Sequence, residues 1–204
     1  MALLEILRFP DPRLREISKP IKKVSPDLKS LADDLVETMY ASKGIGLAAP
    51  QVGNLVRLIA VDTRPRKDGR YEIEEMTEME KTFSYPIVLF NPRIIKAEGK
   101  TTFEEGCLSV PSFFEIVQRA SLVEVHGLDR EGKEVKIVTD GLLAICLQHE
   151  MDHLDGKLFI DHLSLIKSTR IKNKIKKEGY PEKTSRRRGN NSDDGDDSNE
   201  DDIP

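Results

Sequence analysis

Apolar residues recur every three or four positions in three segments of the chain, the spacing of a helix that buries one face. The first segment predicts a helix over residues 26–43, because Ser25 before a proline is typical of a helix start and Gly44 of a helix end. A second helix is expected over about residues 140–156. A third helix, rich in lysine, is expected over residues 163–178.

Six runs of branched and aromatic residues are typical of β-strands. They are separated by polar turns, and Asp129-Arg130-Glu131-Gly132 predicts a hairpin between the last two. Residues 1–24 are punctuated by proline and are expected to form an extended arm. Strands that lie between helices without regular alternation indicate the α+β class. The predicted strands are Val56–Asp62, Ile87–Phe90, Ile94–Ala97, Phe113–Gln118, Leu122–Leu128 and Val135–Val138.

Two polar stretches interrupt this pattern. The segment Arg64–Tyr85 has no clear periodicity and is expected to be a long loop or a short exposed helix. Residues 179–204 consist largely of Asn, Ser, Asp and Gly and are expected to be disordered, because they cannot bury enough apolar surface to order themselves.

The net charge of −4 averages over regions of opposite sign. Residues 167–188 hold 10 basic and 2 acidic side chains, whereas residues 189–204 hold 7 acidic and no basic ones. Residues 1–163 hold 22 basic and 27 acidic side chains, and this acidic balance argues against DNA binding by bulk charge. The argument does not extend to the basic residues 164–188, which are a candidate for binding RNA. With two cysteines and no apolar run long enough for a signal peptide or a membrane span, a cytoplasmic protein is expected.

The strongest chemical signal is His149-Glu150-Met151-Asp152-His153 in the second predicted helix. Residues four apart lie on one helix face, so both imidazoles can bind one metal ion. Glu150 is then placed to handle the protons of a water at an open coordination position. A chance match is disfavoured, because the same face is otherwise apolar, and unpaired polar groups would be costly there.

The third metal ligand is less obvious. The position of the last histidine in the extended pattern of metallopeptidases holds Phe159, His162 has the wrong spacing, and Glu178 lies in a lysine-rich helix. Cys107, in Glu105-Gly106-Cys107-Leu108-Ser109-Val110-Pro111, is the remaining candidate, although a lone cysteine is more often a small buried apolar residue. The segment Gly44–Gln51 combines two glycines with a neutral amide, but alone it suggests only a helix end and a turn.

Taken together and in this order, Gly44–Gln51, Glu105–Pro111 and Gln148–Gly156 resemble the motifs of the peptide deformylase family, over roughly residues 3–178. The chain departs from the family in the length of Arg64–Tyr85, in the tail after Gly179 and in having Gln118 before Arg119. The resemblance implies small mixed or antiparallel sheets packed around a central helix that carries the His-Glu-x-x-His motif.

The resemblance also implies an activity: a metal-dependent hydrolase that removes the N-formyl group from the N-terminal formyl-methionine of newly synthesised polypeptides and releases formate. Its metal would be iron(II), with zinc, nickel or cobalt able to replace it. The implied ligands and catalytic groups are Cys107, His149 and His153 for the metal, Glu150 as general acid and base, and the Gln51 side chain with the Leu108 backbone N–H as oxyanion donors.

The implied substrate pocket follows from helical spacing. Leu142, Ile145 and Cys146 precede His149 by seven, four and three residues, so they share its face and, with Ile45 and Phe103, would hold a methionine side chain. Gly44 and Gly46 would expose backbone groups to the substrate peptide. Glu105 and Arg119 either form a supporting ion pair or are independent surface charges.

The expected organisation is a catalytic domain over residues 1–163, a basic helix over residues 164–178 and a charged tail over residues 179–204. The expected partners are formyl-methionyl nascent chains and, through residues 164–188, the ribosome; the protein is expected to be a monomer. Two alternatives remain: a metallopeptidase, and a structural metal site in a ribosome-binding module without activity.

Overall fold

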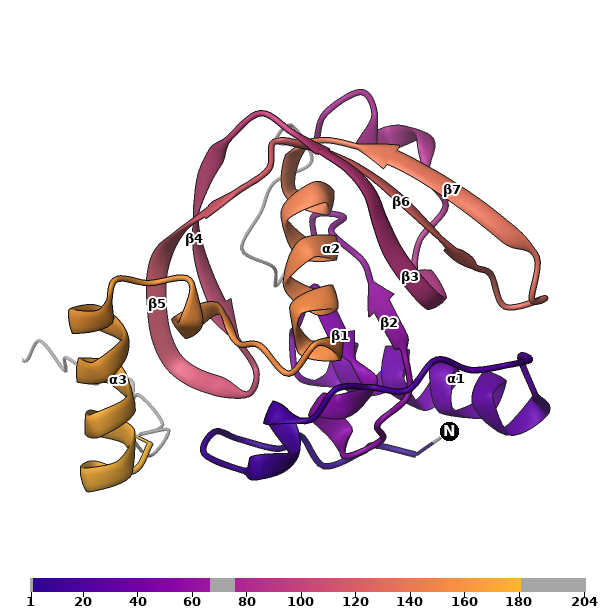
Figure 1. The fold of residues 1–204 in the computed structure, drawn as a ribbon. Helices are drawn as coiled ribbons and strands as arrows, with labels where there is room; N and C mark the ends of the chain where they lie inside the picture. Colours follow the sequence, from indigo (N-terminus) through magenta and orange to yellow (C-terminus); the bar gives the residue numbers. More distant parts are fainter. Residues whose placement is uncertain (1, 67–75, 181–204) are drawn as a thin grey trace, which may run out of the picture.

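The computed structural model describes residues 2–66 and 76–180 (Figure 1). Its three α-helices are α1 (Pro26–Ala41), α2 (Gly141–Leu154) and α3 (Leu165–Glu178). The seven strands of the described residues are β1 (Gly46–Ala48), β2 (Leu58–Val61), β3 (Ile87–Glu98), β4 (Thr101–Cys107), β5 (Val110–Arg119), β6 (Leu122–Leu128) and β7 (Glu134–Thr139).

The strands form two antiparallel sheets, which confirms the predicted α+β class. One sheet has five strands in the order β1-β2-β3-β6-β7, with β1 at an edge, and the other is the hairpin β4-β5. Helix α2 runs between the two sheets, with α1 on one side and α3 outside the β4-β5 hairpin (Figure 1). The helix that carries the histidines is therefore central, as the resemblance implied.

Helix α2 is buried on almost every side, which explains its mostly apolar sequence. Its residues pack against the five-stranded sheet through Leu143, Leu147 and Met151. Its first turn is held by Glu80, whose Oε1 accepts a hydrogen bond from the backbone N–H of Leu143 at 2.7 Å. Glu80 belongs to the polar stretch Arg64–Tyr85, which was expected to be a long loop or a short exposed helix, yet this side chain is only 1% exposed. The acidic side chain stabilises the helix start by satisfying a free N–H at the positive end of the helix dipole.

The strand predictions were right in place but wrong in two details. Ile87–Phe90 and Ile94–Ala97 were predicted as two strands, whereas β3 is continuous with register shifts between them. Asn91, at φ 50°, forms the irregularity. Its side-chain Oδ1 accepts a hydrogen bond from the N–H of Ile21 in the arm, and its Nδ2 donates one to the Ile21 carbonyl. Strands β1 and β4 were not predicted, since one has three residues and the other, Thr101–Cys107, is largely polar.

The predicted basic helix is tied to the rest of the molecule. Ile171 and Ile175 of α3 are buried in a cluster with Phe9 of the arm and Val110 of β5. Most of its lysines are exposed, whereas Lys172 is half-buried and binds Asp161 at 2.9 Å. The predicted tail falls largely on residues 181–204, outside the described residues. No helix in the described part of the chain is both long and apolar enough to cross a membrane.

Candidate active site

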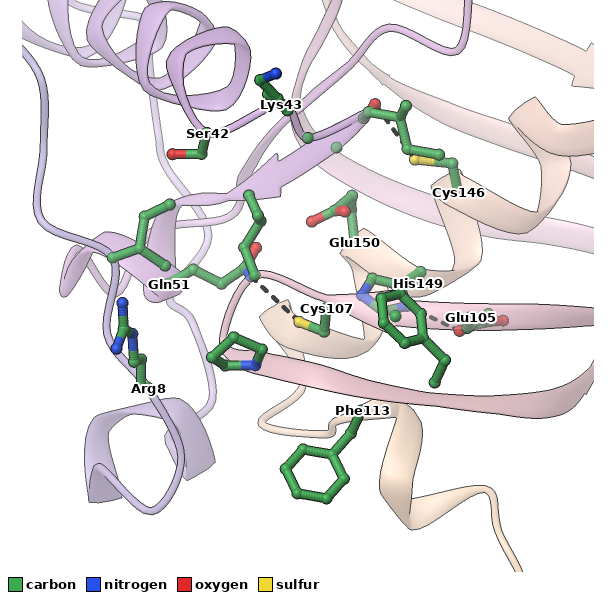
Figure 2. A pocket seen from close by; sticks show the side chains of 18 of the residues that line it. Arg8, Ser42, Lys43, Gln51, Glu105, Cys107, Phe113, Cys146, His149 and Glu150 are labelled. Carbon is green, nitrogen blue, oxygen red and sulfur yellow. Dashed lines mark hydrogen bonds and ion pairs between the residues drawn. The ribbon is translucent and has the colours of Figure 1, made fainter. Parts of the chain in front are cut away.

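The three sequence segments with candidate chemistry meet at one cavity. Helix α2 supplies His149 and Glu150, the end of β4 supplies Cys107, and the 3-10 turn after β1 supplies Gln51. These side chains point toward one another from different elements (Figure 2). They line a cavity of about 1030 Å³ that opens between the edge of β1 and the β4-β5 hairpin.

Cys107, His149 and His153 are close enough to bind a single metal ion. One ligand atom from each lies within 4.8 Å of the others, and Cys107 Sγ is 3.3 Å from His153 Nε2. Zinc–sulfur and zinc–nitrogen bonds of about 2.3 and 2.0 Å in a tetrahedral site place such atoms roughly 3.3–3.6 Å apart, so the cluster fits one ion with modest adjustment. This thiolate and imidazole donor set suits iron(II) or zinc.

The two cysteines differ in their electrostatic surroundings. Burial opposes ionisation of the Cys107 thiol, but the adjacent His153 and His149 outweigh it and lower the Cys107 pKa to about 5. Burial raises the pKa of Cys146 well above its usual value, and the carboxylate of Glu150 adds to the rise. Because the thiolate is the form that binds metals, Cys107 fits a ligand and Cys146 fits an uncharged wall.

His149 is oriented by a buried chain of ionic hydrogen bonds. Its Nδ1 lies 2.8 Å from Glu105 Oε2, which leaves Nε2 to face the cluster. Arg119 binds Glu105 through two N–H groups at 2.7 and 3.0 Å, and also reaches Asp152 at 2.5 Å. The ion pair between Glu105 and Arg119 is therefore present, and it is buried. Such a carboxylate partner fixes the orientation of a metal-binding imidazole.

This chain of contacts also has members that the sequence did not reveal. Asp152 accepts from Arg119 and lies 2.7 Å from Nε2 of His162, the histidine rejected as a ligand by its spacing. Burial opposes ionisation of Asp152, but His162 and Arg119 lower its pKa to about 2. Asp152 lies inside the His149–His153 motif, so its position was visible; its partners were not, because they come from β5 and from the turn after α2.

Glu150 lies beside the cluster and is only 3% exposed. Its Oε2 is buried and has no hydrogen-bond partner among the residues that the structure describes, and burial raises the Glu150 pKa to about 7. An unpaired buried carboxylate is costly and needs a reason. Its position beside the three candidate metal ligands, on the wall of an open cavity, suits a group that exchanges protons with a bound reactant.

Gly46 leaves the space that Glu150 occupies. A Cβ at this position would overlap Glu150 Oε1 and lie 2.8 Å from Cys146 Sγ. Gly46→Ala is therefore expected to displace the carboxylate and to lower kcat/KM for the formate release that the resemblance implies by about 10²-fold, the cost that a 1 Å misplacement can have. Steady-state kinetics on a formyl-methionyl peptide measure this. Gly132→Ala, in the β6-β7 turn, is the control for local strain: Gly132 has φ 79°, so alanine strains this turn, yet the turn lies outside the cavity lining and the folded variant should keep the wild-type kcat/KM. Equal activity of Gly46→Ala and wild type would contradict this role of the glycine.

Gln51 is held firmly at the back of the cavity. Its Oε1 accepts from the Ala48 backbone N–H at 2.8 Å, so its amide group directs Nε2 toward Ser109 Oγ at 3.1 Å and Cys107 Sγ at 3.5 Å. Ser109 was not predicted, although it lies in the quoted Glu105–Pro111 segment. The Leu108 side chain also lines the cavity.

The predicted pocket residues surround the same cavity. Its walls include Gly44, Ile45, Gly46, Phe103, Leu142, Ile145 and Cys146. Cys146 Sγ lies 3.5 Å from the backbone carbonyl of Ile45, which ties α2 to the segment before β1 (Figure 2). The cavity therefore offers an apolar wall next to the candidate metal ligands. It also has Arg64 and Arg66 on its rim, which the sequence did not indicate.

Known proteins share this architecture. The model of the polypeptide deformylase family matches residues 3–169. A peptide deformylase of Alkalilimnicola ehrlichii is 47% identical over 87% of this chain and 91% of its own length, and one of Tolumonas auensis is 49% identical over 87% and 96%. The crystal structure of a peptide deformylase from Legionella pneumophila has a TM-score of 0.72 and 43% identity, covering 86% of this chain and 95% of that one. The Ehrlichia chaffeensis peptide deformylase in complex with actinonin has a TM-score of 0.76 and 37% identity, covering 89% and 100%.

These similarities extend over the arm, both sheets and the helix that carries the histidines. The chain therefore belongs to the polypeptide deformylase family, metal-dependent hydrolases that remove the N-formyl group from newly synthesised polypeptides.

Proposed function

We propose that this chain removes the formyl group from N-terminal formyl-methionine with Glu150 as general acid and base and with a metal ion held by Cys107, His149 and His153. The observation that carries this assignment is the buried Glu150, whose Oε2 has no hydrogen-bond partner in the described part of the chain, beside the cluster of Cys107, His149 and His153 at an open cavity. A closed structural metal site has no use for such a carboxylate, which argues against a ribosome-binding module without activity.

The bound ion is proposed to be iron(II), with zinc, nickel or cobalt able to replace it. When bound, a divalent ion supplies Lewis-acid chemistry: it polarises the formyl carbonyl and makes a water acidic enough to attack near neutral pH. The His149 ring is held for this task by Glu105, and the Cys107 thiol is readily ionised.

The protein side chains handle the protons and the developing charge. Glu150 takes a proton from the attacking water and delivers it to the departing amine, so formate and a free amino terminus are released. Gln51 Nε2 and the Leu108 backbone N–H are proposed to donate hydrogen bonds to the oxygen on which negative charge develops. The fixed orientation of the Gln51 amide supports this role, since it needs no rearrangement during the reaction.

The substrate is proposed to bind as a strand along the free edge of β1. The backbone N–H of Asp62 donates to the Ile45 carbonyl at 2.8 Å, so the pair Ile45 and Asp62 is hydrogen-bonded. Hydrogen-bonded and non-bonded pairs alternate in an antiparallel ladder, and the backbone groups of Gly46 therefore point away from β2, toward the cavity. Main-chain pairing there would place the methionine side chain against Phe103, Ile145 and Cys146.

A metallopeptidase is the nearest rival function. It would normally recruit a further histidine or glutamate after the second histidine, but that position holds Phe159, and His162 pairs with Asp152 instead. Incubation with a formyl-methionyl peptide distinguishes the two. Release of formate with intact internal peptide bonds supports the deformylase, whereas internal cleavage without formate supports the peptidase.

The identity of the metal is tested by purifying the protein without oxygen. We expect about one iron per chain by elemental analysis, and formate release that declines on exposure to air as iron(II) is oxidised, with recovery on reloading with nickel or cobalt. Air-stable activity with a full complement of zinc would show that iron is not the metal used.

The partners beyond the substrate follow from surface charge. We propose that the ribosome is bound through the basic residues of 164–188, that the protein is a monomer, and that it acts in the cytoplasm, where formylated chains are made. The support is the exposed basic face of α3, which includes Arg170, Lys174 and Lys177. Deletion of the helix is a poor test, since it would uncover the core that Ile171 and Ile175 close.

Neutralising the exposed face is a cleaner test of ribosome binding. Replacing Arg170, Lys174 and Lys177 by Gln should weaken salt-sensitive co-sedimentation with ribosomes and reduce the slope of log affinity against log salt by about 2–3, one phosphate contact for each charge. The control replaces three exposed lysines of the β-sheet region, Lys96, Lys100 and Lys133. Equal sedimentation of both triple variants and wild type would contradict docking through α3.

A further inference from the structure

We propose that Arg66 is a specificity-determining residue that favours an acidic side chain at the third position of the formylated polypeptide; this rests on the function proposed above. Arg66 lies at the start of the polar stretch between β2 and β3 and lines the same cavity as Cys107 and His149. It is a feature of this stretch and not of the three motifs that carry the chemistry.

The direction of the substrate along β1 follows from the position of the reacting group. The formyl end must reach Glu150, which lies beside Gly46. The cavity is lined by Gly44, Ile45 and Gly46 but not by Leu47 or Ala48, so the rest of the peptide runs from Gly46 toward Gly44, antiparallel to the chain there. A strand advances about 3.3 Å per residue, so two residues take the peptide about 7 Å along this wall, and its third residue arrives at Gly44.

Arg66 occupies this end of the wall. Its Nη2 donates to the Gly44 carbonyl at 2.7 Å, and its guanidinium carbon lies 5.3 Å from the centre of the Tyr40 ring. These two contacts hold the side chain in place. A guanidinium has five N–H donors in a fixed plane, so the bond to Gly44 leaves others for a substrate carboxylate.

Arg66 also differs from its neighbour Arg64 in whether a carboxylate balances its charge. Arg64 binds both oxygens of Asp62, at 3.0 and 2.7 Å, so its charge is balanced locally. Within the described ranges, no carboxylate forms an ion pair with Arg66. The half-buried Arg66 therefore presents a positive charge to whatever lies at the Gly44 end of the cavity.

The side chain of the third residue should face Arg66. Side chains one and three of a strand lie on the same face. The first enters the apolar pocket formed in part by Leu142 and Ile145, and the third, at Gly44, comes within reach of the guanidinium that binds the Gly44 carbonyl. An acidic third side chain is attracted by the guanidinium and a basic one is repelled.

The test compares three amidated peptides, formyl-Met-Ala-Glu, formyl-Met-Ala-Gln and formyl-Met-Ala-Lys, with formyl-Met-Ala amide as reference. In the wild-type holoenzyme, kcat/KM should fall in the order Glu, Gln, Lys, with about a three- to tenfold ratio of the first to the last, because a partly exposed charge pair gives up to about 1 kcal/mol. The ratio should appear in KM, since the ion pair is equally present in the ground and transition states.

Variants of Arg66 supply the deciding comparison. Arg66→Gln should bring the Glu-to-Lys ratio close to one, and Arg66→Glu should invert it; using a ratio within each variant removes any general loss of activity. Arg93→Glu makes the same charge change on an exposed arginine of β3 outside the cavity lining and should keep the wild-type ratio. A flat wild-type series, or a preference unchanged in Arg66→Glu, would overturn the proposal. Failure to release formate from the reference dipeptide would refute the proposed function itself.

Discussion

Replacement of Glu150 by Gln is expected to reduce kcat for formate release by about 10²–10⁴-fold, the usual contribution of a general acid or base. The amide has nearly the same shape as the carboxylate but cannot accept a proton from water. Glu150 is buried, and its Oε2 has no hydrogen-bond partner in the part of the protein described, so the substitution breaks no visible ion pair. The loss should therefore be chemical and not structural.

Three measurements separate these possibilities for Glu150→Gln. Metal content by elemental analysis should stay near one ion per chain, and the melting temperature should not fall. KM should change little while kcat falls. Glu134→Gln, at the exposed start of β7, is the matched control and should behave as wild type. If Glu150→Gln turned over at the wild-type rate, the assignment of the acid and base would be wrong.

Replacement of Cys107 by Ala is expected to remove the metal and with it about 10³-fold or more of the activity, since Lewis-acid stabilisation supplies several kcal/mol. Two histidines four residues apart cannot hold an ion as firmly as three donors. The lost donor is also the thiol whose pKa the neighbouring imidazoles lower to about 5, so the variant loses the anionic donor of the cluster. Elemental analysis and formate release on the same preparation measure the effect.

The second cysteine provides the matched control. Cys146→Ala removes a thiol from the same cavity, yet it should retain about one metal ion per chain and alter mainly KM, because Cys146 forms an uncharged wall beside Ile45. If Cys146→Ala lost the metal and Cys107→Ala kept it, the ligand set would have to be redrawn. Equal loss in both variants would point to a general effect on folding.

A chain of hydrogen bonds from the exposed His162 through Asp152 to the buried Arg119 and Glu105, and on to His149, connects fold and chemistry. Burial opposes ionisation of Glu105, but Arg119 and His149 overcome it and lower the Glu105 pKa to about 2. A permanently charged carboxylate beside His149 Nδ1 keeps Nε2 directed at the other two candidate metal ligands. Breaking such a buried pair typically costs about 3–5 kcal/mol, so these residues contribute to stability as well as to orientation.

The sequence alone was sufficient for the elements with a strong local signal. Helix α1 begins after Ser25, whose hydroxyl accepts from the Leu28 backbone N–H, because capping and apolar spacing are local properties. The spacing of His149 and His153 likewise required only a helix. The two unpredicted strands have no such local signal: β1 is three residues long, and polar β4 is a strand because it pairs with β5.

The tertiary structure decided which residues act together. Cys107 was a candidate by elimination, and only the packing of the β4-β5 hairpin against α2 brings its sulfur to 3.3 Å from His153. The spacing of Glu105 and Arg119 left open whether they form an ion pair. The sequence likewise left open where the side chains of Glu80 and Arg66, in the polar stretch, would lie. These contacts join residues 14 to 63 positions apart. Sequence determines periodicity and donor chemistry over a few turns of chain, whereas the meeting of distant side chains depends on how two sheets close around one helix.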